Sequence, residues 1–149
     1  MNERSIPDAF LTALSMRDFA RLATCLTPSA QARMLLPRGP EVRSGRDEIG
    51  RRIEGWFAAG SDFDVLETRH EMVGRRHHLS WRFRMRRNNQ APEIVEQVAF
   101  VDVAPDGISQ IDLLCSGFLR DGEPAAVAAE RAVVMCATVP FTSRLRVAR

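Results

Sequence analysis

The sequence contains no lysine and no tyrosine, so all 21 of its basic residues are arginines. Chemistry that needs a lysine Schiff base or a tyrosine acid is therefore excluded. The three cysteines, Cys25, Cys115 and Cys136, are far apart, and none has Cys-x-x-Cys or Cys-x-x-His spacing. Such a set argues against a disulfide framework or a structural zinc site and fits the reducing cytoplasm.

Long hydrophobic runs are also missing, because no stretch approaches the roughly 18 apolar residues of a membrane-spanning helix. The opening segment MNERSIPDAF carries charges and a proline where a secretory signal has an apolar run. The 19 acidic residues nearly cancel the arginines and leave a net charge of +2. We therefore expect a cytoplasmic protein that binds neither nucleic acid nor membrane.

The composition is that of a globular domain, with 149 residues, 45% hydrophobic and 27% charged. Apolar residues at helical spacing predict helices over 6–15 and 19–26, the second capped by Asp18. A third helix opens at 44–47 and carries an apolar stripe that ends at Phe57. Two short strands, 33–36 and 41–43, are expected between the second and third helices.

After Gly60 the apolar residues recur at every second position, which predicts strands over 63–73, 78–87, 94–103 and 108–119. Their short connections indicate an antiparallel meander. Helices followed by hairpins are typical of an α+β fold with helices on one face of the sheet. We expect one domain over 1–122 and a C-terminal extension over 123–149, with a helix to about residue 136 and a basic tail.

The order of these elements resembles that of the nuclear transport factor 2-like superfamily. The resemblance covers residues 6–119 and rests on RDFARLATCL, SGRDEIGRRI and PDGISQIDLL. Within the superfamily the chain looks most like the SnoaL-like polyketide cyclase and ketosteroid isomerase group.

This resemblance implies a cone-shaped, cystatin-like fold, in which N-terminal helices pack on a strongly curved antiparallel sheet of four long strands plus a short hairpin. It also implies an internal apolar pocket and a homodimer. No single reaction is implied, because this fold hosts isomerases, cyclases, hydrolases, dehydratases and non-catalytic binders. The steroid isomerases use a pocket tyrosine, which this chain lacks.

Strand alternation predicts which side chains face the helices. We take 104–107 and 88–91 as four-residue turns, and residues that pair across a turn lie on one face. The resulting inner face is mostly apolar, and its titratable members are His70, His77 and Glu96. The expected pocket residues are Phe10, Leu14, Trp56, Thr68, Trp81, Phe83, Val98, Phe100, Leu113 and Cys115.

His70 and Glu96 are the candidate catalytic residues. Apolar surroundings favour the protonated form of a carboxyl group, so Glu96 is expected to stay neutral. In this hypothesis His70 removes a proton beside the carbonyl of a small apolar substrate, and Glu96 hydrogen-bonds to or protonates the enolate. If the last turn holds an odd number of residues, Asp112 replaces Cys115 in the pocket and becomes the alternative.

Other interpretations stay open. Glu96 can be bonded to an arginine or a helix end, and His70 can be a core histidine. The chain is then a non-catalytic ligand-binding or dimerisation module, and large aromatic residues can even fill the cone. No cofactor or metal is expected, since His77 and His78 point to opposite faces of a strand. The expected partners are a small apolar ligand and a second copy bound through the outer face of the sheet.

Overall fold

The computed structural model describes residues 5–87 and 89–122. The predicted C-terminal helix and basic tail lie outside these residues. The elements, in chain order, are α1 (Ser5–Ser15), α2 (Phe19–Thr24), β1 (Leu26–Leu36), β2 (Gly39–Ser44), α3 (Arg46–Phe57), β3 (Gly60–Val73), β4 (Arg76–Arg87), β5 (Glu93–Ala104) and β6 (Gly107–Arg120). The predicted α+β fold is confirmed.

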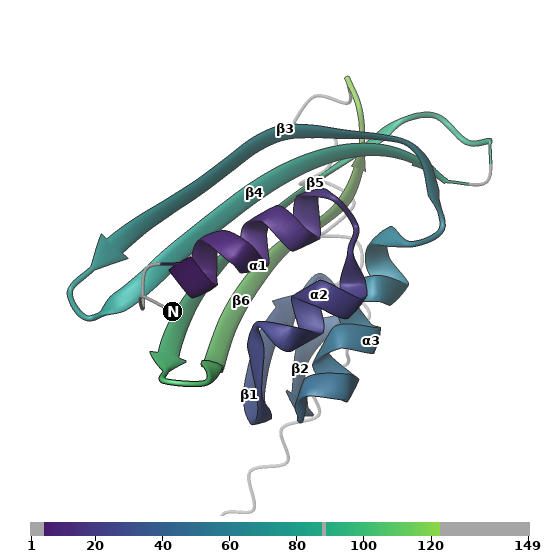
Figure 1. Ribbon diagram of the computed structural model, residues 1–149. Helices are drawn as coiled ribbons and strands as arrows, with labels where there is room; N and C mark the ends of the chain where they lie inside the picture. Colours follow the sequence, from purple (N-terminus) through teal and green to yellow (C-terminus); the bar gives the residue numbers. More distant parts are fainter. Residues whose placement is uncertain (1–4, 88, 123–149) are drawn as a thin grey trace, which may run out of the picture.

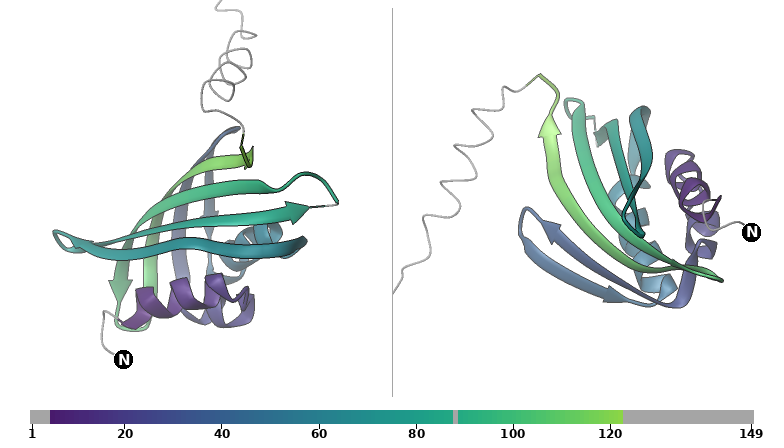
Figure 2. Two further views of the ribbon diagram at one scale, coloured as in Figure 1. Left: turned by 90° about the horizontal axis from the view of Figure 1, so that it is seen from above. Right: turned by 90° about the vertical axis from the view of Figure 1, so that its left-hand side faces the viewer.

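The strands form one six-stranded sheet in the order β2-β1-β6-β5-β4-β3 (Figure 1). All neighbours are antiparallel except β1 and β6, which run parallel. The sheet is strongly curved, and the three helices lie on its concave side (Figure 2). No helix of residues 5–87 or 89–122 lies on the convex face of the sheet.

Two predicted features of the helices, the cap of α2 and the apolar stripe of α3, are present in the structure. Asp18 caps α2 as predicted, because its side chain accepts a hydrogen bond from the backbone N–H of Arg21 at 3.0 Å. The predicted stripe of α3 is buried at Ile49, Ile53 and Phe57, whereas Trp56 is half-buried.

The segment around Pro28 differs from the prediction, which extended the second helix to residue 26 and began the next strand at residue 33. The helix ends at Thr24, and Leu26 already begins β1. The pairing of β1 with β6 is irregular between Leu26 and Gln31. A proline fits there because a bulge does not need its missing N–H group.

The register of β5 is shifted by one residue from the prediction. Phe83 pairs with Val95 and Met85 with Glu93, so the connection holds an odd number of residues. A shift of one residue turns every side chain of a strand to the other face. The residues of β5 that face the helices are therefore Val95, Gln97, Ala99 and Val101.

The strand β6 keeps its predicted faces for a different reason than expected. Val103 pairs with Ile108 as predicted, but the register then shifts, so that Gln97 pairs with Cys115 and Phe100 with Asp112. This irregularity offsets the shift in β5. Cys115 faces inward and Asp112 outward.

Large side chains fill most of the concave side. The ring of Phe57 lies 5.4 Å from that of Phe83 and 6.3 Å from those of Phe63 and Phe118. Five of the expected pocket residues are buried in this core: Phe10, Leu14, Trp81, Phe83 and Leu113. The expectation that they line an open pocket is wrong, because these five side chains pack into the hydrophobic core.

Candidate functional site

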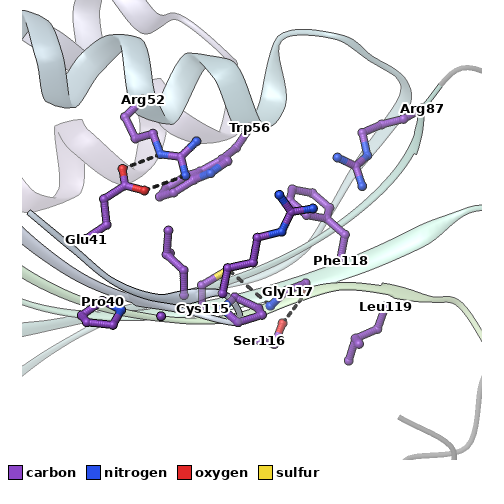
Figure 3. A pocket seen from close by; sticks show the side chains of 14 residues that line it. Pro40, Glu41, Arg52, Trp56, Arg87, Cys115, Ser116, Gly117, Phe118 and Leu119 are labelled. Atoms are coloured by element: carbon purple, nitrogen blue, oxygen red, sulfur yellow. Dashed lines mark hydrogen bonds and ion pairs between the residues drawn. The ribbon is translucent and has the colours of Figure 1, made fainter. Parts of the chain in front are cut away.

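An open groove of about 780 Å³ lies on the concave side, between α3 and strands β1, β2 and β6. Figure 3 shows Arg52 and Trp56 on the helix side and Cys115 and Phe118 on the sheet side. The β1–β2 turn, residues 36–40, borders the groove, and Arg87 at the end of β4 also lines it. The groove combines aromatic surface with several charges.

Gly117 brings the β1–β2 turn close to β6. Its φ is +82°, and a Cβ atom there would lie 2.8 Å from Cγ of Pro37. Only glycine adopts this backbone conformation without strain and leaves room for the proline ring. The backbone N–H of Gly117 also donates to Sγ of Cys115 at 3.4 Å, which orients the thiol beside the turn.

The helix side of the groove is held by an ion pair between Arg52 and Glu41. Nε and Nη2 of Arg52 donate to the two carboxylate oxygens of Glu41 at 2.8 and 3.0 Å. Arg43 donates to the same carboxylate at 2.8 Å. Burial alone would raise the pKa of Glu41, but the hydrogen bonds from Arg43 and Arg52 outweigh it and lower the pKa. Glu41 is therefore ionised at neutral pH and already bonded.

Each of two groove arginines also stacks on an aromatic ring. The guanidinium carbon of Arg52 lies 5.0 Å from the centre of the Trp56 ring. That of Arg87 lies 4.0 Å from the centre of the Phe118 ring, while its Nε and Nη2 bond to Glu93 at 2.8 and 2.7 Å. Cation–π contact and a carboxylate partner together fix the planes of both guanidinium groups.

The predicted pocket residues are divided between different places. Trp56 and Cys115 line the groove. Thr68 is exposed beside α1, in a separate shallow depression between α1 and β3. Val98 and Phe100 lie on the outer face, paired with Leu114 and Asp112. Their predicted inward placement is wrong because of the one-residue shift in β5.

Glu96 does not face the helices as predicted. It is exposed on the outer face, opposite Arg82 on β4. His70 lies on the other side of the sheet, where its Nδ1 is 2.7 Å from Asp8 and its Nε2 is 2.8 Å from His77. The predicted pairing of His70 and Glu96 around one ligand is therefore wrong.

Asp112, the alternative to Cys115, points outward and is bonded. The hydrogen bond from Arg33, at 2.6 Å, does most to lower its pKa to about 2, and bonds from Arg76 and Gln110 add to this effect. Its carboxylate is ionised at neutral pH and lies on the outer face, so it does not serve as an acid in a pocket on the concave side.

The groove residues Arg38, Glu41, Arg52, Arg87 and Phe118 were not predicted. One signal was available, since Arg52 and Trp56 are four residues apart and so share a face of the third helix. Among residues 5–87 and 89–122, no cluster of three or more histidine, cysteine or acidic side chains is placed to hold a metal ion. No helix in the same ranges is long and apolar enough to cross a membrane.

No protein-family profile matches the sequence, and no curated protein matches it. Solved structures do match. A candidate polyketide cyclase from Xanthomonas campestris superposes with a TM-score of 0.61 at 12% identity, over 75% of this chain and 88% of its own. A ketosteroid isomerase-like protein from Catenulispora acidiphila, solved in complex with trimethylamine, gives 0.59 at 15% identity, over 72% and 82%.

An NTF-2 like protein of unknown function from Burkholderia xenovorans gives a TM-score of 0.56 at 12% identity, over 96% of this chain and 94% of its own. At these identities the likeness concerns the fold alone. The fold that the resemblance implies, helices packed on a strongly curved sheet, is confirmed.

Proposed function

We propose that this chain uses its nuclear transport factor 2-like fold to bind a small organic molecule with a flat apolar part in the groove beside α3. One observation carries this proposal: the groove keeps about 780 Å³ beside the rings of Trp56 and Phe118, whereas the aromatic residues Phe10, Trp81 and Phe83 are buried in the core. That volume is within the range of small-molecule sites, about 300–1,000 Å³. The trimethylamine complex of the Catenulispora acidiphila protein is a case of a small ligand held by the same fold.

Binding is better supported than acid–base catalysis. Glu41 is the carboxylate that lines the groove, and Arg43 and Arg52 already occupy its oxygens. His70 lies outside the groove lining, bonded to Asp8 and His77. A general acid or base must reach the proton that it transfers, and neither group has that access.

The two tryptophans allow a direct test with uncharged 2-naphthol as the probe. Trp56 lines the groove, whereas Trp81 is buried and donates its indole N–H to Gln97 at 2.8 Å. In a ¹H–¹⁵N NMR titration of the full chain, we expect the Trp56 indole signal to shift and the Trp81 signal to stay. Trp56→Phe assigns the two signals.

Replacing Phe118 by leucine should weaken 2-naphthol binding by about threefold or more, because a stacking surface is lost. Phe19→Leu, at the start of α2 and away from the groove, is the matched control and should leave binding unchanged. If neither indole signal moves at saturating 2-naphthol, or both move equally, the proposal is wrong.

A homodimer through the outer face of the sheet is a second part of the proposal. Leu35, Val42 and Leu114 point outward from β1, β2 and β6 and are 55%, 63% and 54% exposed. Leu35 pairs directly with Leu114 across β1 and β6. Exposed apolar side chains on one face are typical of an interaction surface. In sedimentation velocity, the wild type should run as a dimer and Leu114→Glu as a monomer. Met16→Glu, which changes an exposed residue on the helix side, is the control and should stay dimeric. A wild-type monomer would contradict this part.

We also propose the cytoplasm as the location. Cys25 and Cys115 are both free thiols, which fits a reducing compartment. Fractionation of cells that produce the full chain tests this, and recovery outside the cytoplasm would overturn it.

A further inference from the structure

Positive charge exceeds negative charge along the groove. Among the described residues, Arg38, Arg52 and Arg87 line it. Glu41, also in the lining, pairs with Arg52 and Arg43, and Glu93 pairs with Arg87. Four guanidinium groups are thus balanced by only two carboxylates. The groove therefore presents a positive field to an incoming molecule, although the whole chain is nearly neutral.

Two of these guanidinium groups are fixed before any ligand arrives. Arg52 and Arg87 each use Nε and Nη2 on a carboxylate and lie against an aromatic ring. In both residues Nη1 makes no hydrogen bond within the described ranges. Such a preorganised donor loses little conformational entropy when it binds an anion.

Arg38 differs from these two residues because its whole guanidinium group is available. It is exposed in the β1–β2 turn and makes no hydrogen bond or ion pair with any residue of 5–87 or 89–122. The turn itself is held against β6, where Pro37 packs on Gly117. A guanidinium group without a bonding partner among the described residues therefore lies on this turn, at the border of the groove.

We propose that the ligand of this groove carries a carboxylate, which Arg38 binds while the flat apolar part of the ligand lies beside Trp56 and Phe118. This inference rests on the proposed function. A carboxylate is favoured because its two coplanar oxygens match the planar fork of a guanidinium group. The Nη1 atoms of Arg52 and Arg87 add to the positive electrostatic potential at the carboxylate, and their guanidinium groups are already held in place.

Two probes of nearly the same shape test the proposal: naphthalene-2-carboxylate and naphthalene-2-methanol. Both are titrated into the full chain at neutral pH and low salt, and the Trp56 indole signal reports binding. We expect the carboxylate to bind about tenfold tighter or more. Arg38→Ala and Arg38→Gln should remove most of this preference. Arg51→Ala, which deletes an exposed arginine of α3 outside the groove, should keep it.

The possible failures are distinguishable. If both probes shift Trp56 with equal affinity, the groove binds ligands but the carboxylate inference is wrong. If neither probe shifts Trp56, the proposed function fails as well. A preference that survives in both Arg38 variants, or that Arg38→Ala and Arg51→Ala reduce equally, would also overturn the inference. An unchanged Trp81 signal checks that each variant is folded.

Discussion

Nε2 of His70 lies 2.8 Å from Nδ1 of His77, so the two imidazole rings share one hydrogen bond. Nδ1 of His70 is in turn 2.7 Å from a carboxylate oxygen of Asp8. These three side chains connect α1 to the hairpin of β3 and β4. In the bond between the rings one nitrogen donates and the other accepts.

Loss of this connection should destabilise the fold. His70→Leu removes both hydrogen bonds and leaves the buried His77 without its bond to the neighbouring ring. We predict that His70→Leu lowers the free energy of unfolding by about 1 kcal/mol or more at neutral pH. Urea unfolding measures this. His78→Leu, on the outer face, is the matched control and should cost less, and equal losses in the two variants would contradict the prediction.

The stabilisation that Asp112 gives to the fold should depend on pH. Its pKa is lower in the folded chain, about 2, than the usual 3.8, chiefly because Arg33 bonds to it. The stabilisation is therefore complete above about pH 4 and is lost as the pH falls through about 2. We predict that Asp112→Asn costs about 1 kcal/mol at neutral pH, a modest value because solvent screens the partly exposed group, and less at each step toward pH 2. Asp106→Asn, in an exposed turn, should show no such trend.

Gly107 should be intolerant of a side chain. Its φ is +150°, and a Cβ atom would lie 2.9 Å from backbone atoms of Cys25, Leu26 and Thr27. We predict that Gly107→Ala lowers the free energy of unfolding by about 2 kcal/mol or more. Gly39→Ala is the matched control, because Gly39 has a φ of +120° but nothing within 4 Å of its Cβ position. Equal losses in thermal or chemical unfolding would show that conformation alone, and not the close approach, matters.

Gln97 and Trp81 should be energetically coupled. Gln97 is 1% exposed, its Oε1 accepts the indole N–H of Trp81, and its Nε2 has no partner within the described residues. Trp81→Phe leaves both ends of the buried amide unbonded, which is costly. We predict that Trp81→Phe combined with Gln97→Met costs about 1 kcal/mol less than the sum of the single variants. A double-mutant cycle in urea tests this, and additive losses would disprove the coupling.

The strands could be predicted from alternation, but the face of β5 could not. Val95 and Val98 point to opposite sides, and so do the polar neighbours Glu96 and Gln97. Over residues 94–101 either face therefore shows one polar residue among apolar ones. Hydrophobicity therefore cannot choose between the registers. The odd-length connection after Met85 and the irregularity after Asp102 decide the outcome, and neither changes the alternation within a strand.

The groove could be predicted only in part. The spacing of Arg52 and Trp56 places both on one face of α3, and this is visible in the sequence. The Glu41–Arg52 ion pair depends on how the β1–β2 hairpin leans against α3. That contact is tertiary, and local patterns carry no information about it.

The parallel pairing of β1 with β6 also bears on how the chain reaches this structure. β1 ends at Leu36 and β6 begins at Gly107, so the two strands meet only after a long loop has closed. The hairpins of β3 to β6 need only local contacts and are expected to form earlier. Since the groove lies between the β1–β2 turn and β6, it exists only when β1 has paired with β6. We therefore expect any opening of this parallel pairing to abolish the groove, even where the hairpins of β3 to β6 stay intact.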